Sequence, residues 1–85
     1  MSWRLIVDKS VSKELKRVPR KIATRVFSVI EHLVEDPFFG DIEKMEGEDF
    51  VWRRRVGSYR IFYEVLQREK LIRITNVKRR TSKTY

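Results

Sequence analysis

The most regular hydrophobic pattern in the chain is helical and runs from Arg20 to Glu35. Its apolar residues recur at intervals of three and four, as on one face of a helix. They are Ile22, Val26, Val29, Ile30 and Leu33, with Ala23, Phe27 and Val34 widening the stripe. Asp36 and Pro37 end the pattern, because the residue before a proline is pushed out of helical geometry. A shorter helix is predicted from the capping residues at 8–12 to about Val18, and Pro19 separates the two helices.

A second pattern has a period of two and predicts a pair of strands over residues 51–65, joined by a tight turn at Val56-Gly57-Ser58. In the second strand, one face carries Tyr59, Ile61, Tyr63 and Val65, and the other face carries Arg60, Phe62 and Glu64. In the first strand, Arg53 and Arg55 share one face, and Arg54 falls on the other with Trp52. We therefore expect Arg53, Arg55 and Arg60 on one face of a sheet that has an apolar face behind it. Arg54 would have to extend from the apolar face to an edge.

Two more strands and a loop complete the expected order. Residues 3–7 predict a first strand, and Leu71 to Val77 predict a last strand that follows a polar turn at residues 67–70. The acidic stretch at residues 38–49 predicts a connecting loop. The chain is thus expected to form one α+β domain over residues 1–85, in the order β-α-α-β-β-β. A helical hairpin would cover one face of a small antiparallel sheet.

The positive charge of the chain is concentrated in its last third. Residues 1–51 carry nine Lys or Arg and ten Asp or Glu, whereas residues 52–85 carry eleven Lys or Arg and only two acidic residues. A net charge of −1 is therefore followed by one of +9, which favours nucleic acid or an acidic protein as a partner. The chain has no cysteine, which excludes disulfides and thiolate metal sites. It shows no signal peptide or membrane span, and a cytoplasmic protein is expected.

Few residues of the usual catalytic types are present. His32 is the only histidine, so neither a Ser-His-Asp set nor a histidine metal site can be assembled. The acids at residues 41–49 match no calcium loop and are interpreted as solvated charge. The remaining candidates are arginines, whose guanidinium groups can donate paired hydrogen bonds to the phosphate oxygens of an RNA that is cleaved or bound. The candidate set for cleaving or gripping RNA is Arg53, Arg55, Arg60, Arg79, Arg80 and Tyr85.

Three segments together resemble the RelE/ParE toxin superfamily. Residues 52–65 are similar to the central hairpin of these toxins, residues 13–19 to their first helix, and residues 74–80 with Tyr85 to their last strand and basic tail. The resemblance implies a RelE-like fold and the toxin of a type II toxin–antitoxin system, neutralised by a RelB-like antitoxin. Its RelE branch implies a metal-independent endoribonuclease without cofactor, which cleaves mRNA in the ribosomal A site by attack of the RNA 2′-hydroxyl. Its ParE branch implies instead a toxin that inhibits DNA gyrase, and a plain nucleic-acid-binding module is a third interpretation.

The resemblance also implies roles for individual residues. Arg53 and Arg55 match the paired basic residues of the first hairpin strand, and Arg60 matches a phosphate-binding arginine. Arg80, or Arg79 in a shifted register, matches the group that protonates the leaving oxygen. Tyr85 matches a tyrosine that stacks on a substrate base. Basic residues near the end of the chain are assigned to substrate binding: Lys78, Arg79 and Lys83.

Overall fold

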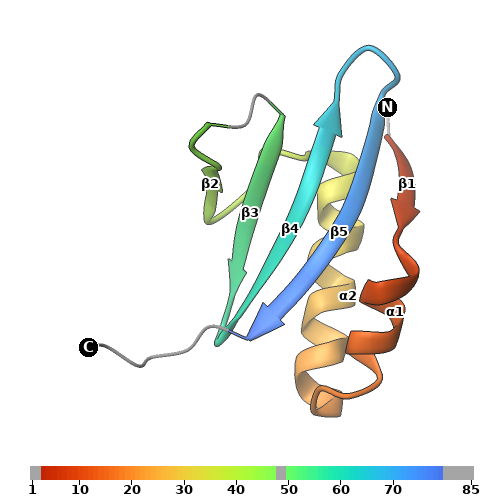
Figure 1. Ribbon diagram of the computed structural model, residues 1–85, viewed down its shortest axis with the longest axis vertical. Helices are drawn as coiled ribbons and strands as arrows, with labels where there is room; N and C mark the ends of the chain where they lie inside the picture. Colours follow the sequence, from red (N-terminus) through yellow and green to blue (C-terminus); the bar gives the residue numbers. More distant parts are fainter. Residues whose placement is uncertain (1–2, 48–49, 80–85) are drawn as a thin grey trace.

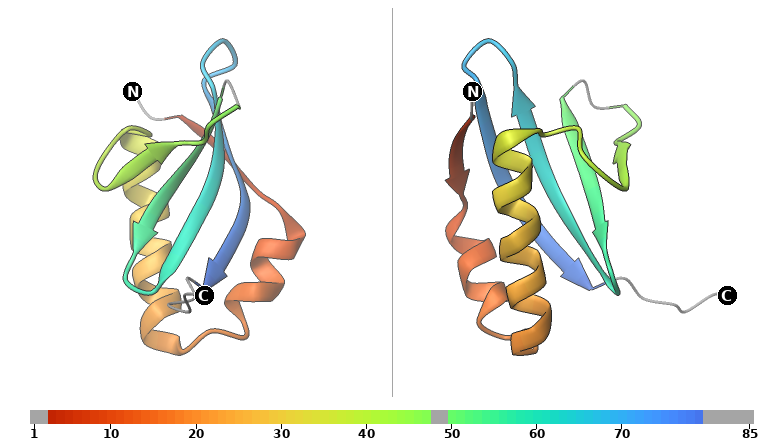
Figure 2. Two further views of the ribbon diagram at one scale, coloured as in Figure 1. Left: turned by 60° about the vertical axis from the view of Figure 1, so that its left-hand side comes forward. Right: turned by 180° about the vertical axis from the view of Figure 1, so that it is seen from behind.

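The computed structural model describes residues 3–47 and 50–79, which form two helices and a five-stranded sheet (Figure 1). The helices are α1 (Lys9–Leu15) and α2 (Arg20–Glu35). The strands are β1 (Arg4–Val7), β2 (Ile42–Lys44), β3 (Val51–Val56), β4 (Tyr59–Leu66) and β5 (Leu71–Arg79). Both helices lie on one face of the sheet (Figure 2). In the part of the chain described, no helix or strand covers the opposite face, which we call the outer face.

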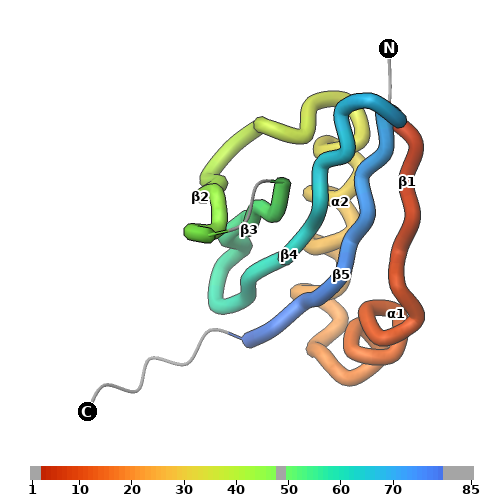
Figure 3. Tube along the Cα trace, turned by 45° about the horizontal axis from the view of Figure 1, so that its top comes forward, coloured from red at the N-terminus to blue at the C-terminus, as the bar shows by residue number. Residues whose placement is uncertain are grey.

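The α+β class, the helical hairpin and the basic β-hairpin are confirmed, but the sheet differs from the prediction in two ways. Its strand order is β1-β5-β4-β3-β2, and β1 pairs in parallel with β5, with Arg4 opposite Leu71 (Figure 3). The expectation of a purely antiparallel sheet was therefore wrong. The predicted loop at residues 38–49 was also wrong in part, because it contains β2, which pairs antiparallel with β3. Both errors concern strand pairing: β1 pairs with a strand far along the chain, and β2 pairs with the strand that follows it.

Side chains of the two helices and the inner face of the sheet form the core. From the helices come Val11, Leu15, Val26, Ile30 and Leu33, and from the strands Val56, Tyr59, Ile61, Tyr63, Val65, Ile72, Ile74 and Val77. The first helix ends at Leu15 rather than Val18, although Val18 is still buried in the turn that follows. Phe27 does not join the apolar stripe as expected, and it is 54% exposed on α2. The helical stripe is thus narrower than the sequence indicated.

The hairpin of β3 and β4 has the register that the alternation predicts. Arg55 lies opposite Arg60, and Arg53 lies opposite Phe62. Along β4, buried and half-buried residues alternate without interruption from Tyr59 to Leu66. Gly57, in the turn, has a φ of +58°, which glycine adopts without the steric cost that a side chain would add. The hairpin therefore presents one apolar face to the helices and one polar face outward.

A β-bulge changes the alternation within β5. Phe62 of β4 lies opposite Asn76, and the next residue, Tyr63, lies opposite Ile74, which leaves Thr75 as an extra residue. The Thr75 hydroxyl donates a hydrogen bond of 3.2 Å to the Phe62 carbonyl. Because of this extra residue, Ile74 and Val77 both reach the core although they are three positions apart. Beyond the bulge, Asn76 therefore lies on the outer face.

The segment between α2 and β2 is fastened to the sheet by two side chains. The buried Tyr63 hydroxyl donates a 2.7 Å hydrogen bond to the Pro37 carbonyl, and burial raises the pKa of this phenol. Arg54 Nη1 donates to the Phe39 carbonyl at 2.9 Å, and its guanidinium lies 4.8 Å from the centroid of the Phe39 ring. Arg54 thus leaves the apolar face and reaches the edge, as the alternation predicts. These contacts hold the chain in position to enter β2.

Candidate nucleic-acid interface

Three positively charged side chains lie in one row across the outer face of the sheet. Arg55 of β3 lies opposite Arg60 of β4, and Arg60 lies opposite Lys78 of β5. Like charges directly opposite each other on neighbouring strands destabilise a sheet. The row, which we call the basic row, is therefore an arrangement that folding alone does not favour. It is suited to a ligand that carries several negative charges.

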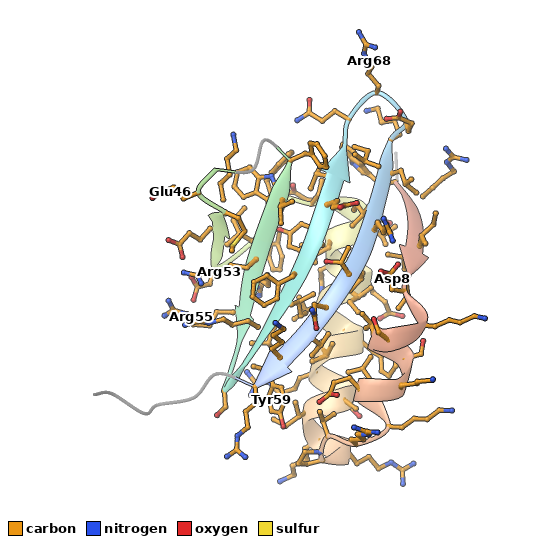
Figure 4. All side chains as sticks on the ribbon, viewed as in Figure 1. Asp8, Glu46, Arg53, Arg55, Tyr59 and Arg68 are labelled. Carbon is orange, nitrogen blue, oxygen red and sulfur yellow. The ribbon has the colours of Figure 1, made fainter. Side chains whose placement is uncertain are left out.

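Arg53 extends this positive surface along β3, and two acidic residues lie beside it, Glu43 of β2 and Asp41 directly before that strand. Arg53 Nε donates to Glu43 Oε1 at 2.9 Å, and Nη2 of the same arginine contacts that oxygen as well. Asp41 Oδ2 lies 3.8 Å from Arg55 Nε. Figure 4 shows Arg53 and Arg55 leaving β3 together on the side of β2. The two acids and the arginines line one small crevice: Asp41, Glu43, Arg53, Arg55 and Arg60.

The arginines keep Glu43 ionised. The hydrogen bond from Arg53 and the charge of Arg53 are the main causes that lower the pKa of Glu43 from its ordinary value of 4.5, and Arg55 and Arg60 add to the effect. The Glu43 carboxylate is therefore charged at neutral pH, beside the three guanidinium groups of the crevice. Neither acid was predicted as part of the site, because residues 38–49 were expected to form a solvated loop. The signal that could have revealed them is Ile42, an apolar residue between Asp41 and Glu43, as in a short edge strand.

An aromatic residue also lies on this surface. Phe62 faces outward from β4, opposite Arg53 on one side and Asn76 on the other. The Lys78 ammonium lies 6.0 Å from the centroid of its ring. The alternation with Arg60 already predicts that Phe62 faces outward, but no motif in the sequence marks it as a candidate. The surface thus combines positive charge with one apolar ring.

His32 and Arg54 serve the structure of the other face. His32 is on α2, and its Nδ1 lies 2.9 Å from the Ser28 carbonyl. Its ring stacks on Phe39 with 5.4 Å between centroids.

Within residues 3–47 and 50–79, no three His, Asp or Glu side chains gather as metal ligands do. No helix in these ranges is long and apolar enough to cross a membrane.

A comparison with protein families identifies the chain. The model of the family "ParE toxin of type II toxin-antitoxin system, parDE" matches residues 5–83. The chain belongs to this toxin family. The match includes every element of the fold, from β1 to β5, and also the basic face of the sheet.

Relatives of the toxin and solved structures agree with this assignment. The toxin is 32% identical over 83 residues to "Putative toxin RelE1" of Methanocaldococcus jannaschii, an alignment that covers 94% of this chain and 92% of the relative. Its structure is similar to RelE in the RelE–RelB complex of Pyrococcus horikoshii, with a TM-score of 0.85, 30% identity, and coverage of 98% of this chain and 100% of that one. For the M. jannaschii RelB–RelE complex, the TM-score is 0.75 at 31% identity, with 87% and 88% covered. The toxin therefore has the RelE fold.

The structure brings together part of the candidate set. Arg53, Arg55, Arg60 and Lys78 share the outer face of the toxin. Arg79 lies opposite Tyr59, whose side chain is buried on the inner side, so the register places Arg79 on the other face from Lys78. Arg80, Lys83 and Tyr85 lie outside the residues that the structure describes. The roles of all these residues are taken up below as proposals.

Proposed function

We propose that the toxin is an endoribonuclease that cleaves mRNA at the ribosomal A site, by in-line attack of a 2′-hydroxyl and without a metal ion. The basic row supports this proposal most directly, because Arg55, Arg60 and Lys78 lie side by side on the sheet face that no described helix or strand covers. Such a surface can bind the sugar–phosphate backbone of one RNA strand. The proposal follows the RelE-type relatives of the toxin at 30–32% identity.

Arginine side chains would bind and stabilise the reacting phosphate. Cleavage by an internal hydroxyl passes through a pentacovalent phosphorane with two negative charges, and preorganised donors lower its free energy. Arg53, Arg55 and Arg60 line one crevice, so a phosphate there could accept hydrogen bonds from more than one of them. Arg60 is the central member, since it lies on β4 between Arg55 and Lys78. We assign Arg60 the main contact with the phosphate.

Glu43 is the group in the crevice best suited to accept the proton of the attacking hydroxyl. Arginine barely deprotonates and is a poor general base. Glu43 is ionised and hydrogen-bonded to Arg53. When Arg53 turns to a phosphate, Glu43 loses this partner, and its pKa rises toward the ordinary value. Binding of RNA would therefore make the carboxylate more basic at the moment the proton must leave.

Residues of the C-terminal segment would complete the site. The family resemblance assigns the proton for the leaving oxygen to Arg80, or to Arg79, and base stacking to Tyr85. Lys78, Arg79 and Lys83 would contribute to substrate binding. Because the register turns Lys78 toward Arg60 and Arg79 away from it, Lys78 is the better placed of these two to contact a phosphate on the outer face.

We also propose that a RelB-like antitoxin neutralises the toxin, since the P. horikoshii and M. jannaschii structures described above are complexes of RelE with RelB. An acidic, amphipathic antitoxin segment would approach the basic face through its charges and dissociate slowly because of its apolar contacts. Association measured by stopped flow should therefore slow with added salt. An association rate that is independent of ionic strength would contradict the electrostatic part of this proposal.

One experiment distinguishes the nuclease from a ParE-like inhibitor of DNA gyrase, the alternative that the family name raises. The wild-type toxin and an Arg60→Ala variant are induced in cells, and new mRNA 5′ ends are mapped at single-nucleotide resolution. Purified toxin is added in parallel to a gyrase supercoiling assay. The proposal predicts cuts at a fixed codon position, absent in Arg60→Ala and resistant to chelator in vitro. Inhibited supercoiling with intact mRNA would overturn it in favour of the gyrase inhibitor.

A further inference from the structure

Phe62 is a half-buried aromatic residue on the outer face of the sheet, outside the apolar core. It faces away from the helices, and it belongs neither to the buried core nor to the partly buried apolar residues packed against that core. Its cross-strand neighbours are both polar, Arg53 on β3 and Asn76 on β5. The residue two positions earlier on the same face is Arg60. The half-buried ring of Phe62 therefore lies among cations and an amide rather than among apolar side chains.

The Lys78 side chain lies near the face of the ring and can move aside. The Lys78 ammonium lies 6.0 Å from the ring centroid, which is at the outer limit of an effective cation–π contact. Lys78 is itself exposed. A flat ligand can therefore displace the lysine side chain from the ring, while the ammonium remains close enough to pair with a negative charge on the same ligand.

The surroundings of the ring indicate what kind of ligand it binds. A nucleotide carries a flat aromatic base and a phosphate a short distance apart, and Phe62 with its neighbours offers an aromatic face beside guanidinium groups. Residues opposite each other on paired strands have Cβ atoms about 4.5–5.5 Å apart, so a phosphate held by Arg53 places its base within reach of the ring. Proteins that bind single-stranded RNA on an open sheet use outward-facing aromatics in this way.

We propose that Phe62 is a nucleobase-stacking residue for single-stranded RNA on the outer face of the sheet. One unstacked base of the substrate lies against the ring of Phe62, and the phosphates on either side of it contact Arg53, Arg60 and Lys78. The Asn76 amide, on the strand opposite Phe62, can donate to or accept from the edge of the same base. The inference rests on the proposed function and adds a base contact on β4 to it.

An apolar anchor of the antitoxin is the other partner that could cover the ring. The exposed large apolar residues of the described chain lie on other elements: Leu5, Ile6, Phe27, Phe38, Phe39 and Phe50. A protein anchor typically fills a pocket with several apolar walls, whereas Phe62 has charged and amide neighbours. The chemistry around the ring therefore favours a base over an apolar side chain.

The test measures binding of two short RNAs that cannot be cleaved. Both are six-nucleotide strands with 2′-fluoro sugars, and the second lacks one central base but keeps its phosphates. Their affinities are compared for wild-type toxin, Phe62→Ala and Phe62→Trp. The matched control is Phe27→Ala, which removes an exposed phenylalanine from α2 on the covered side of the sheet. Circular dichroism melting checks that each variant is folded.

The expected result is a loss that depends on the base. Phe62→Ala should weaken binding of the intact RNA by roughly 5- to 100-fold, the effect of losing one base–aromatic stack, and Phe62→Trp should keep it. The base-free RNA should bind wild type and Phe62→Ala equally well, and the salt dependence should not change, because the phosphate contacts remain. Phe27→Ala should behave as wild type.

Three outcomes overturn the inference. Equal affinity of wild type and Phe62→Ala for the intact RNA means that no base stacks on the ring. An equal loss for the intact and the base-free RNA means that the substitution disturbs the phosphate contacts instead. A Phe62→Ala toxin that binds both RNAs normally but loses affinity for the antitoxin makes Phe62 a protein anchor. Base-dependent binding without any mRNA cleavage keeps the inference and refutes the nuclease, so the two proposals fail separately.

Discussion

Arg53, Arg54 and Arg55 are consecutive residues of one type on β3, yet they have different partners. Arg54 points to the helix-covered side and donates to two backbone carbonyls, those of Phe39 at 2.9 Å and Arg55 at 3.3 Å. Arg53 and Arg55 point to the outer face and pair with Glu43 and Asp41. A strand turns successive side chains to opposite faces. The alternation of side chains along β3 therefore places Arg54 in a structural role and Arg53 and Arg55 in the candidate site.

The difference between the partners has a chemical consequence. The Phe39 carbonyl lies in a segment that Arg54 and Tyr63 hold in place, so it is a fixed acceptor for Arg54. The carboxylates of Glu43 and Asp41 are exposed side chains, with 60% and 65% of their surface accessible. Ion pairs of exposed groups contribute little free energy, and a phosphate can replace the carboxylate. The outer arginines can thus exchange partners, whereas Arg54 cannot do so without releasing the loop.

The largest effect is expected for Glu43→Gln. If Glu43 is the general base, its loss should lower the rate of mRNA cleavage by roughly 10²–10⁴-fold, measured in a single-turnover assay with programmed ribosomes. Asp41→Asn is the matched control, since Asp41 lies in the same crevice and pairs with Arg55 at 3.8 Å. A Glu43→Gln toxin with an undiminished rate would show that Glu43 is only a counter-ion.

The pH dependence gives a second view of the same carboxylate. In the free toxin, Arg53 lowers the pKa of Glu43 below 4.5, so the base is ionised above that pH, and kcat/KM should fall only in more acidic solution. In the proposed RNA complex, Arg53 would contact phosphate and the pKa of Glu43 would rise, so kcat should begin to fall at a higher pH than kcat/KM. Coincident acidic limbs would contradict the exchange of partners. The ion pair of Glu43 with Arg53 stabilises the fold above the unfolded-state pKa of Glu43. This stabilisation is lost as the pH falls through the lowered pKa of Glu43 in the folded state.

Arg60→Ala should have the next largest effect. Loss of one preorganised donor to a developing oxyanion typically costs about 10²–10³ in rate, while the melting temperature should change little because Arg60 faces outward. Arg60→Lys keeps the charge but loses the forked geometry and should recover only part of the rate. An Arg60→Ala toxin that cleaves normally would show that the basic row takes no part in the reaction.

Arg54→Ala should lower stability and leave the cleavage rate nearly unchanged, the reverse of what is expected for Arg60→Ala. The substitution removes the hydrogen bond to Phe39 and the contact with its ring, and should lower the free energy of unfolding by about 1–2 kcal/mol. Urea denaturation measures this loss. Cleavage per folded molecule should stay within a few-fold of wild type. A large loss of cleavage rate with unchanged stability would show that the face on which an arginine of β3 lies does not decide its role.

The smallest effect is expected for His32→Ala. His32 is exposed, and its contacts are the Ser28 carbonyl of its own helix and the Phe39 ring. The free energy of unfolding should change by about 0.5 kcal/mol or less, and the cleavage rate should be unaltered. A folded but inactive His32→Ala toxin would mean that the site lies elsewhere.

Local periodicity accounts for what the sequence could predict. The helix at residues 20–35 and the hairpin of β3 and β4 follow from spacings within a single segment. The outward positions of Arg53, Arg55 and Arg60 follow from the same alternation. The inner position of Arg54 was predicted for this reason, although nothing in the sequence named Phe39 as its partner.

Contacts between distant segments account for what the sequence could not predict. The three residues of β2 form a strand only because β3 is beside them, and without β2 neither Glu43 nor Asp41 enters the site. The parallel pairing of β1 with β5 joins residues more than sixty positions apart, such as Arg4 and Leu71. The extra residue Thr75 decides whether Lys78 or Arg79 faces outward, and a bulge of this kind depends on the register with β4. Each of these features requires a partner strand, which a local pattern does not contain.

The position of β5 within the sheet has a consequence for how the toxin is made. The strand that comes last in the described chain lies between β1 and β4. While a ribosome is still translating residues 71–79, β1 has no partner and β4 has an open edge, so the sheet cannot be complete. The basic row is also incomplete, because Lys78 belongs to β5. A nascent chain therefore acquires the intact outer face only after β5 has been synthesised and has paired with β1 and β4.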